Sequence, residues 1–218
     1  MTYWRRTEVD PQKLIQTRYG FALPDIYRAL LVKGHFTTKP WKNYLSFDDC
    51  EWLSLDQIAN YKFLDFQITS DGGFVPFAVS SRRDEYCWRL DWATGTESPV
   101  VFCEYGESGF GYAPDFRGFL YRKALEEFAG HNDFANDEGK LVELRQAVKI
   151  ISPHLPTSWS NQLRELAACG LDDWHTGEYG ELYVLPKSEL ADRIASQLAF
   201  PQLNETFAQD KERARRTE

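Results

Sequence analysis

Residues 44–105 alternate between apolar and polar with a period of two, and this pattern limits the fold more than any other feature. The apolar runs are short and are broken by Asp, Gly, Ser and Pro, which is typical of antiparallel strands joined by turns. In the clearest run, Tyr86, Trp88, Leu90 and Trp92 fall on one face of the strand. The expected strands are residues 44–47, 52–55, 74–80, 85–92 and 100–105.

Helical spacing of apolar residues flanks this region on both sides. Asp10 and Pro11 supply a cap and a first-turn residue, and Gly34 ends a second helix that begins near Pro24. Further helices are expected at residues 56–61, 114–128, 140–152, 158–168 and 187–200, with one more strand at 181–185. The predicted fold class is α+β, an antiparallel sheet of about five to six strands with N-terminal helices and a closing helix packed on it.

The polar, turn-rich stretch HNDFANDEG at residues 131–139 is the candidate boundary between two parts of the chain. Residues 1–130 form the expected α+β domain. Residues 131–218 form a mostly helical C-terminal extension with one short strand, and the final KERARRTE is expected to be a disordered basic tail.

The net charge of −8 argues against nucleic acid or an anionic membrane as the partner, because both would require a basic surface. A basic protein partner is favoured instead, although such acidity also keeps proteins soluble. No apolar run follows the two N-terminal arginines and no stretch approaches the ~20 apolar residues of a membrane span, so a cytoplasmic location is expected.

The cysteines and histidines show no spacing typical of metal ligands or of a redox motif. The cysteines are expected to be reduced and mostly buried, and no cofactor or metal is predicted. They stand at positions 50, 87, 103 and 169, and the histidines stand at positions 35, 131, 154 and 175.

Two other features could suggest catalysis, and neither supports it. The segment GESGFG at residues 106–111 lacks the second glycine of a nucleophile elbow and the lysine of a phosphate loop, so a flexible loop before a helix is expected. Neighbouring carboxylates, Glu104 with Glu107 and Asp48 with Asp49, could share acid–base work but are better explained as a solvated rim. No catalytic residue is predicted, and the protein is expected not to be an enzyme.

Several short motifs appear in a fixed order along residues 10–130. A helix begins with LPDIY and ends at a glycine turn. The segments that follow are GFVPFA at 73–78, RLDW at 89–92, VVFCEY at 100–105 and FRGFL at 116–120. In combination and order these motifs resemble the SUKH superfamily, the Smi–Knr type of domain, over about residues 10–130.

The resemblance implies an α+β domain that, in bacteria, neutralises a specific toxin, often a nuclease, by tight binding. An acidic surface would complement such a basic partner and speed its association. The predicted partner-binding residues are acidic positions in turns and strand ends: Asp48, Asp49, Glu51, Asp84, Glu85, Glu104 and Glu107. A regulatory or scaffold protein in cell-wall or signalling control is the alternative, followed by an uncharacterised enzyme.

Overall fold

Six strands form one antiparallel sheet in the order β1-β2-β3-β4-β5-β8, so the α+β fold is confirmed. The strands are β1 (Glu51–Trp52), β2 (Phe74–Val79), β3 (Glu85–Arg89), β4 (Val100–Cys103), β5 (Gly109–Ala113) and β8 (Thr206–Phe207). The computed structural model describes residues 10–37, 44–63, 73–95, 97–130, 137–178 and 180–207. Most of the expected boundary, residues 131–136, and the expected basic tail lie outside this described part.

One face of the sheet carries large aromatic side chains, and these form the main core. Trp88 of β3 lies 4.5 Å from Phe77 of β2 and 5.1 Å from Tyr27, measured between ring centroids. Phe77 lies on this face two residues after Val75, and Ala78 joins the same core because the pairing of β2 with β3 shifts between Pro76 and Ala78. Each buried ring removes about 150–250 Å² from water, so this cluster is the main source of hydrophobic stabilisation in the sheet.

Three N-terminal helices pack beside the sheet, and the first and third of them begin at a side-chain cap. They are α1 (Pro11–Tyr19), α2 (Asp25–Val32) and α3 (Leu55–Ala59). The Asp10 carboxylate accepts a hydrogen bond from the amide of Gln12, which satisfies a free donor at the start of α1. At α3, Ser54 and Gln57 form a reciprocal capping box.

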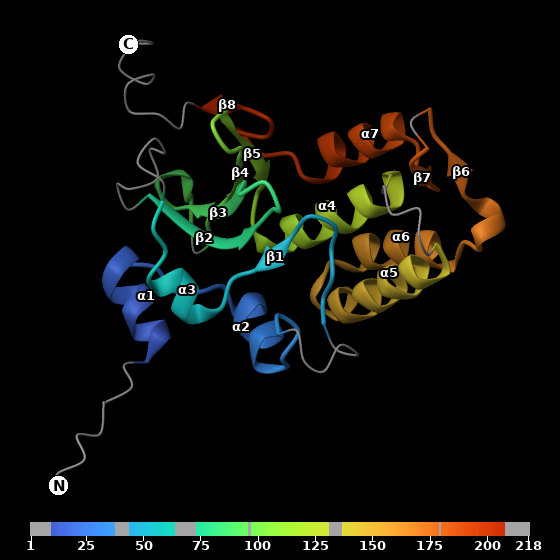
Figure 1. Cartoon of the computed structure of the whole chain (residues 1–218). Helices are drawn as coiled ribbons and strands as arrows, with labels where there is room; N and C mark the ends of the chain where they lie inside the picture. Colours follow the sequence, from blue (N-terminus) through green and yellow to red (C-terminus); the bar gives the residue numbers. More distant parts are fainter. Residues whose placement is uncertain are drawn as a thin grey trace, which may run out of the picture.

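Helix α4 (Phe116–Ala129) covers the aromatic face of the sheet and is itself covered by the C-terminal extension. The extension contributes α5 (Asp137–Ile151), α6 (Thr157–Ala168), α7 (Lys187–Gln197) and the short strands β6 (His175–Thr176) and β7 (Leu182–Tyr183). Figure 1 shows α5, α6 and α7 gathered around α4, away from α1 and α3. Residues from both halves of the chain therefore share one hydrophobic core.

Three expectations from the pattern of the sequence were wrong. Residues 44–47 form no strand, and only Phe47 makes an isolated bridge, with Cys50. The strand expected at 85–92 ends at Arg89, and Trp92 packs in a second cluster on the opposite face of the sheet from Trp88. The expected flexible loop contains β5, because its glycines leave room for the C-terminal segment to approach.

No helix in the described ranges has both the length and the apolar character needed to cross a membrane.

Candidate functional site

The antiparallel register brings three chain segments to one end of the sheet. Strand β1 begins at Glu51 opposite Val79, which is the last residue of β2. Strand β3 begins at Glu85 opposite Cys103, which ends β4, and β5 begins at Gly109 opposite the same Cys103. Residues 48–51, 80–85 and 104–108 therefore meet at this end, which we call the turn end of the sheet.

All seven acidic residues predicted from the sequence lie at the turn end, but they differ in exposure. Asp49, Glu51 and Glu107 are exposed. Asp48 and Glu104 are partly buried, whereas Asp84 and Glu85 each retain only 2% of their accessible surface.

Two carboxylates hold the loops of the turn end together. Asp84 accepts hydrogen bonds from the Ser80 hydroxyl at 2.8 Å and from the backbone amide of Tyr105 at 2.8 Å. Asp49 accepts from the amide of Ser81 at 2.7 Å. Burial alone would raise the pKa of Asp49, but the bonds from Ser81 and the nearby cations outweigh it and hold this pKa below its ordinary value. Asp84 and Asp49 thus fix the loops that carry the exposed carboxylates of the turn end.

Asp48 makes a different contact, with the C-terminal extension. Lys140 of α5 lies 2.5 Å from the Asp48 carboxylate and 3.1 Å from that of Glu127 in α4. Burial would lower the pKa of Lys140, but these two carboxylates outweigh it and raise the pKa above its ordinary value. The ammonium group therefore stays charged and ties the turn end to the extension.

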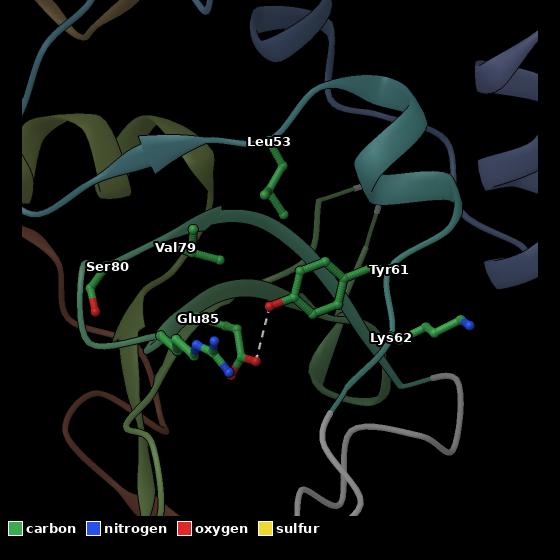
Figure 2. Close-up of a pocket in the computed structure, with 7 residues that line it drawn as sticks. Leu53, Tyr61, Lys62, Val79, Ser80 and Glu85 are labelled. Carbon is green, nitrogen blue, oxygen red and sulfur yellow. Dashed lines mark hydrogen bonds between the residues drawn. The ribbon is translucent and has the colours of Figure 1, made fainter.

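A pocket of about 270 Å³ opens beside the turn end, between the segment from β1 to α3 and the β2–β3 hairpin (Figure 2). Leu53 and Val79 supply apolar walls, and the Tyr61 hydroxyl donates a hydrogen bond to Glu85 at 3.1 Å. Burial, followed by the Glu85 charge, raises the pKa of Tyr61, so the phenol stays protonated. The lining residues are Leu53, Tyr61, Lys62, Val79, Ser80, Arg83 and Glu85.

The size and lining of the pocket limit what it could hold. Its volume is just under the ~300–1,000 Å³ typical of small-molecule sites. Its lining includes one carboxylate and no histidine or cysteine. Within the described ranges, no three His, Cys, Asp or Glu side chains are grouped as a metal site requires.

Several residues of this region were not predicted, because negative charge alone does not identify them. Lys62 and Arg83 line the pocket, and Arg83 holds a left-handed backbone conformation with φ of 69°. Arg82 is exposed and pairs with Asp84 at 3.3 Å. Tyr105 is a large side chain with 43% of its surface accessible. Lys62, Arg83 and Tyr105 are far apart in the sequence, and only the folded sheet brings them to one region. A short-range sequence pattern therefore does not predict that they are neighbours.

Comparison with protein families matches residues 8–122, a little over half of the chain, to the model described as SMI1 / KNR4 family (SUKH-1). No curated protein and no solved structure matches the chain in the other two comparisons. The matched residues include β1 to β5 and all seven acidic positions of the turn end.

Proposed function

The chain belongs to the SMI1 / KNR4 family (SUKH-1), and from this premise we propose that it is an immunity-type protein that neutralises a basic toxin by direct binding. A nuclease is the expected kind of toxin, because an enzyme that cleaves nucleic acid carries a basic binding surface. The protein acts without catalysis and requires no cofactor. Its binding surface is the turn end of the sheet with the adjoining pocket.

The observation that supports this proposal is the gathering of acidic residues at one rigid end of the sheet. Exposed carboxylates of Asp49, Glu51 and Glu107 come from two separate segments, residues 48–51 and 104–108, that the sheet register aligns. Hydrogen bonds from Ser80, Ser81 and Tyr105 to carboxylates fix these segments. A surface that is already ordered loses little conformational entropy on binding, which favours high affinity.

The negative charge of the whole chain, like that of the turn end, favours binding of a basic partner. A net charge of −8 attracts a basic partner from a distance and raises the association rate. Tyr105 and the pocket between Leu53 and Val79 supply apolar contact area, which charge alone does not provide. The proposed interface therefore has steering charges around an anchor point.

The test begins with affinity capture of the tagged protein from cells of its source, followed by mass spectrometry before and after a high-salt wash. We expect one basic partner to survive the wash. The affinity of that partner is then measured for the wild type, for the double variant Glu51→Lys/Glu107→Lys and for the control Asp172→Lys/Asp192→Lys. The control reverses two exposed carboxylates in the C-terminal extension and changes the net charge equally.

We expect the turn-end variant to bind about ten-fold more weakly or worse, mainly through slower association, and the control to stay within about three-fold. Equal weakening by both variants would mean that net charge alone acts, and it would remove the turn end as the binding surface. Capture of several partners with moderate affinity would favour the regulatory role over immunity.

A further inference from the structure

Helices α5 and α6 form a second surface, outside the residues that match the family. A groove of about 310 Å³ runs between them. Val148 and Pro153 from the α5 side and Ala167 from α6 give it an apolar floor, and Arg145, Lys149 and Arg164 line it as well. The α5 residues recur at helical spacing, so they form one stripe along the helix. We call this feature the α5–α6 groove.

The three cations of the α5–α6 groove have no carboxylate partner within the described ranges. Arg145 instead donates to the backbone carbonyls of Ala167 at 2.8 Å and Cys169 at 3.0 Å, which fixes it over the end of α6. Lys149 and Arg164 are exposed. Positive charge in this groove is therefore available to a ligand.

The sequence places no carboxylate one helical turn away from Lys149 or Arg164. Positions three and four residues away on either side of Lys149 and Arg164 hold no Asp or Glu, so helical ion pairs cannot form. In α7 the opposite arrangement occurs, with Arg193 paired to Glu189 one turn away. The chain as a whole is acidic, yet three cations around this groove have no carboxylate partner among the described residues. Positive charge is therefore concentrated at the groove, where it could attract a negatively charged ligand.

We propose that the α5–α6 groove docks an acidic amphipathic helix of a partner protein. The apolar floor between Val148 and Ala167 would bury the apolar stripe of such a helix, and its flanking carboxylates would meet Lys149 and Arg164. A nucleic acid offers charge without an apolar stripe, and the net charge of −8 would repel it. The apolar floor and the unpaired cations together therefore favour a protein segment.

This docking site is independent of the proposed toxin-binding function. It uses positive charge where the turn end uses negative charge, and its residues come from the C-terminal extension. Failure of one proposal therefore leaves the other untouched.

The experiment uses the full-length protein and two fluorescein-labelled synthetic peptides of about 15 residues, a length near the minimum for a helix in water. Both peptides carry the same Leu stripe at helical spacing, with Glu at the remaining positions of one and Lys in the other. Fluorescence anisotropy gives the affinity at about 20 mM and about 300 mM salt, where screening differs strongly. The protein variants are Lys149→Glu, Arg164→Glu and their combination.

Lys13→Glu is the matched control, because Lys13 is an exposed cation in α1 with the same charge change. We expect the Glu peptide to bind and the Lys peptide not to bind. The double variant should weaken binding of the Glu peptide about ten-fold, each single variant about three-fold, and Lys13→Glu less than two-fold. Thermal unfolding of each variant confirms that the fold is retained.

Three results would overturn the proposal. The first is the same affinity of the Glu peptide for the wild type and the double variant, and the second is no binding of the Glu peptide at low salt. The third is a single-stranded oligonucleotide of matched charge that binds as tightly as the Glu peptide, because the apolar floor would then contribute nothing.

Discussion

Charged side chains inside the molecule are stabilising only where each one has a fixed partner. Helix α4 carries Arg122, Lys123 and Glu127 in the interior between the sheet and the extension. Arg122 donates to the Tyr112 carbonyl at 2.8 Å, and Lys123 donates to the Asp48 carbonyl at 3.1 Å. Glu127 accepts a hydrogen bond from the backbone amide of Asp48 and pairs with Lys140, which comes from the other half of the chain. Removing a partner would leave a buried charge without compensation.

Replacing Lys140 with Met tests how much its ion pair with Glu127 contributes to the stability of the fold. We expect Lys140→Met to lower the free energy of unfolding at pH 7 by about 3 kcal/mol, because the buried carboxylate of Glu127 loses its ion pair. Chemical denaturation measures this loss. Lys187→Met is the matched control, since Lys187 is largely exposed and its ion pair with Glu181 should contribute less than about 1 kcal/mol.

The pH dependence of Lys140→Met separates lost charge compensation from lost packing. Burial holds the pKa of Glu127 above its ordinary value even with Lys140 present, and removing that cation raises it further. A carboxyl whose folded pKa exceeds its unfolded pKa binds protons preferentially in the folded state, so the loss in the variant should shrink as pH falls. A loss that is the same at pH 7 and pH 5, or that persists in Glu127→Gln/Lys140→Met, would contradict this account.

At the scale of elements, the pairing of β5 with β8 depends on glycine. A Cβ at Gly111 would lie 1.9 Å from the carbonyl oxygen of Gln202, and one at Gly109 would lie 2.4 Å from the Phe207 ring. The Gly111 amide donates to the Glu205 carbonyl at 3.0 Å. The C-terminal segment therefore reaches the sheet edge only because these positions carry no side chain.

Gly111→Ala should displace β8 from the sheet edge and cost about 1–3 kcal/mol of stability, because the backbone of residue 202 cannot yield to the added methyl group. Hydrogen exchange measures the displacement as faster exchange of the amides in residues 203–207. Gly95→Ala is the control, since no atom of the residues that the structure describes lies within 4 Å of the Cβ that it adds. Unchanged exchange in residues 203–207 would show that β8 holds without the glycine.

Local signals explain which elements the sequence predicted. Capping residues and apolar spacing lie within the elements themselves, so α2, α4, α6 and α7 were all expected near their observed positions. Strand β5 was missed because GFG looks like a loop, and the reason for its glycines lies about 90 residues further along the chain. Strand β8 was missed for a different reason, because its two residues are too few to make a periodic pattern.

At the scale of the whole molecule, the sequence predicted the charge of the candidate site but not its geometry. Acidic residues in turns were identified one by one, and only the register of β1 to β5 places them at one end. Whether a carboxylate is displayed or used internally depends on long-range contacts. Asp84 is buried under the loop of Tyr105, and Asp48 is held by Lys140, 92 residues away. Charge patterning contains no signal for either contact.

Other long-range contacts, between α4 and the C-terminal extension, determine whether residues 1–130 can fold alone. Tyr121 of α4 is fully buried and stacks on Trp159 of α6 at 4.7 Å between ring centroids. The Phe128 carbonyl accepts the amides of Val184 and Leu185, both at 2.9 Å. Without the extension, α4 would expose this side to water, at a cost of about 1.5–3 kcal/mol for each large apolar side chain.

A chain truncated after Gly130 should therefore lose cooperative folding, because several such side chains together approach the ~5–15 kcal/mol that stabilises a typical domain. We expect it to bind a hydrophobic dye, to lack near-ultraviolet circular dichroism and to show no sharp thermal transition, while the full chain unfolds in one step. A sharp transition with native near-ultraviolet dichroism would instead establish residues 1–130 as an independent domain. The family-matched residues would then fold first and the extension would dock afterwards, whereas the shared core around α4 predicts that the two parts fold together.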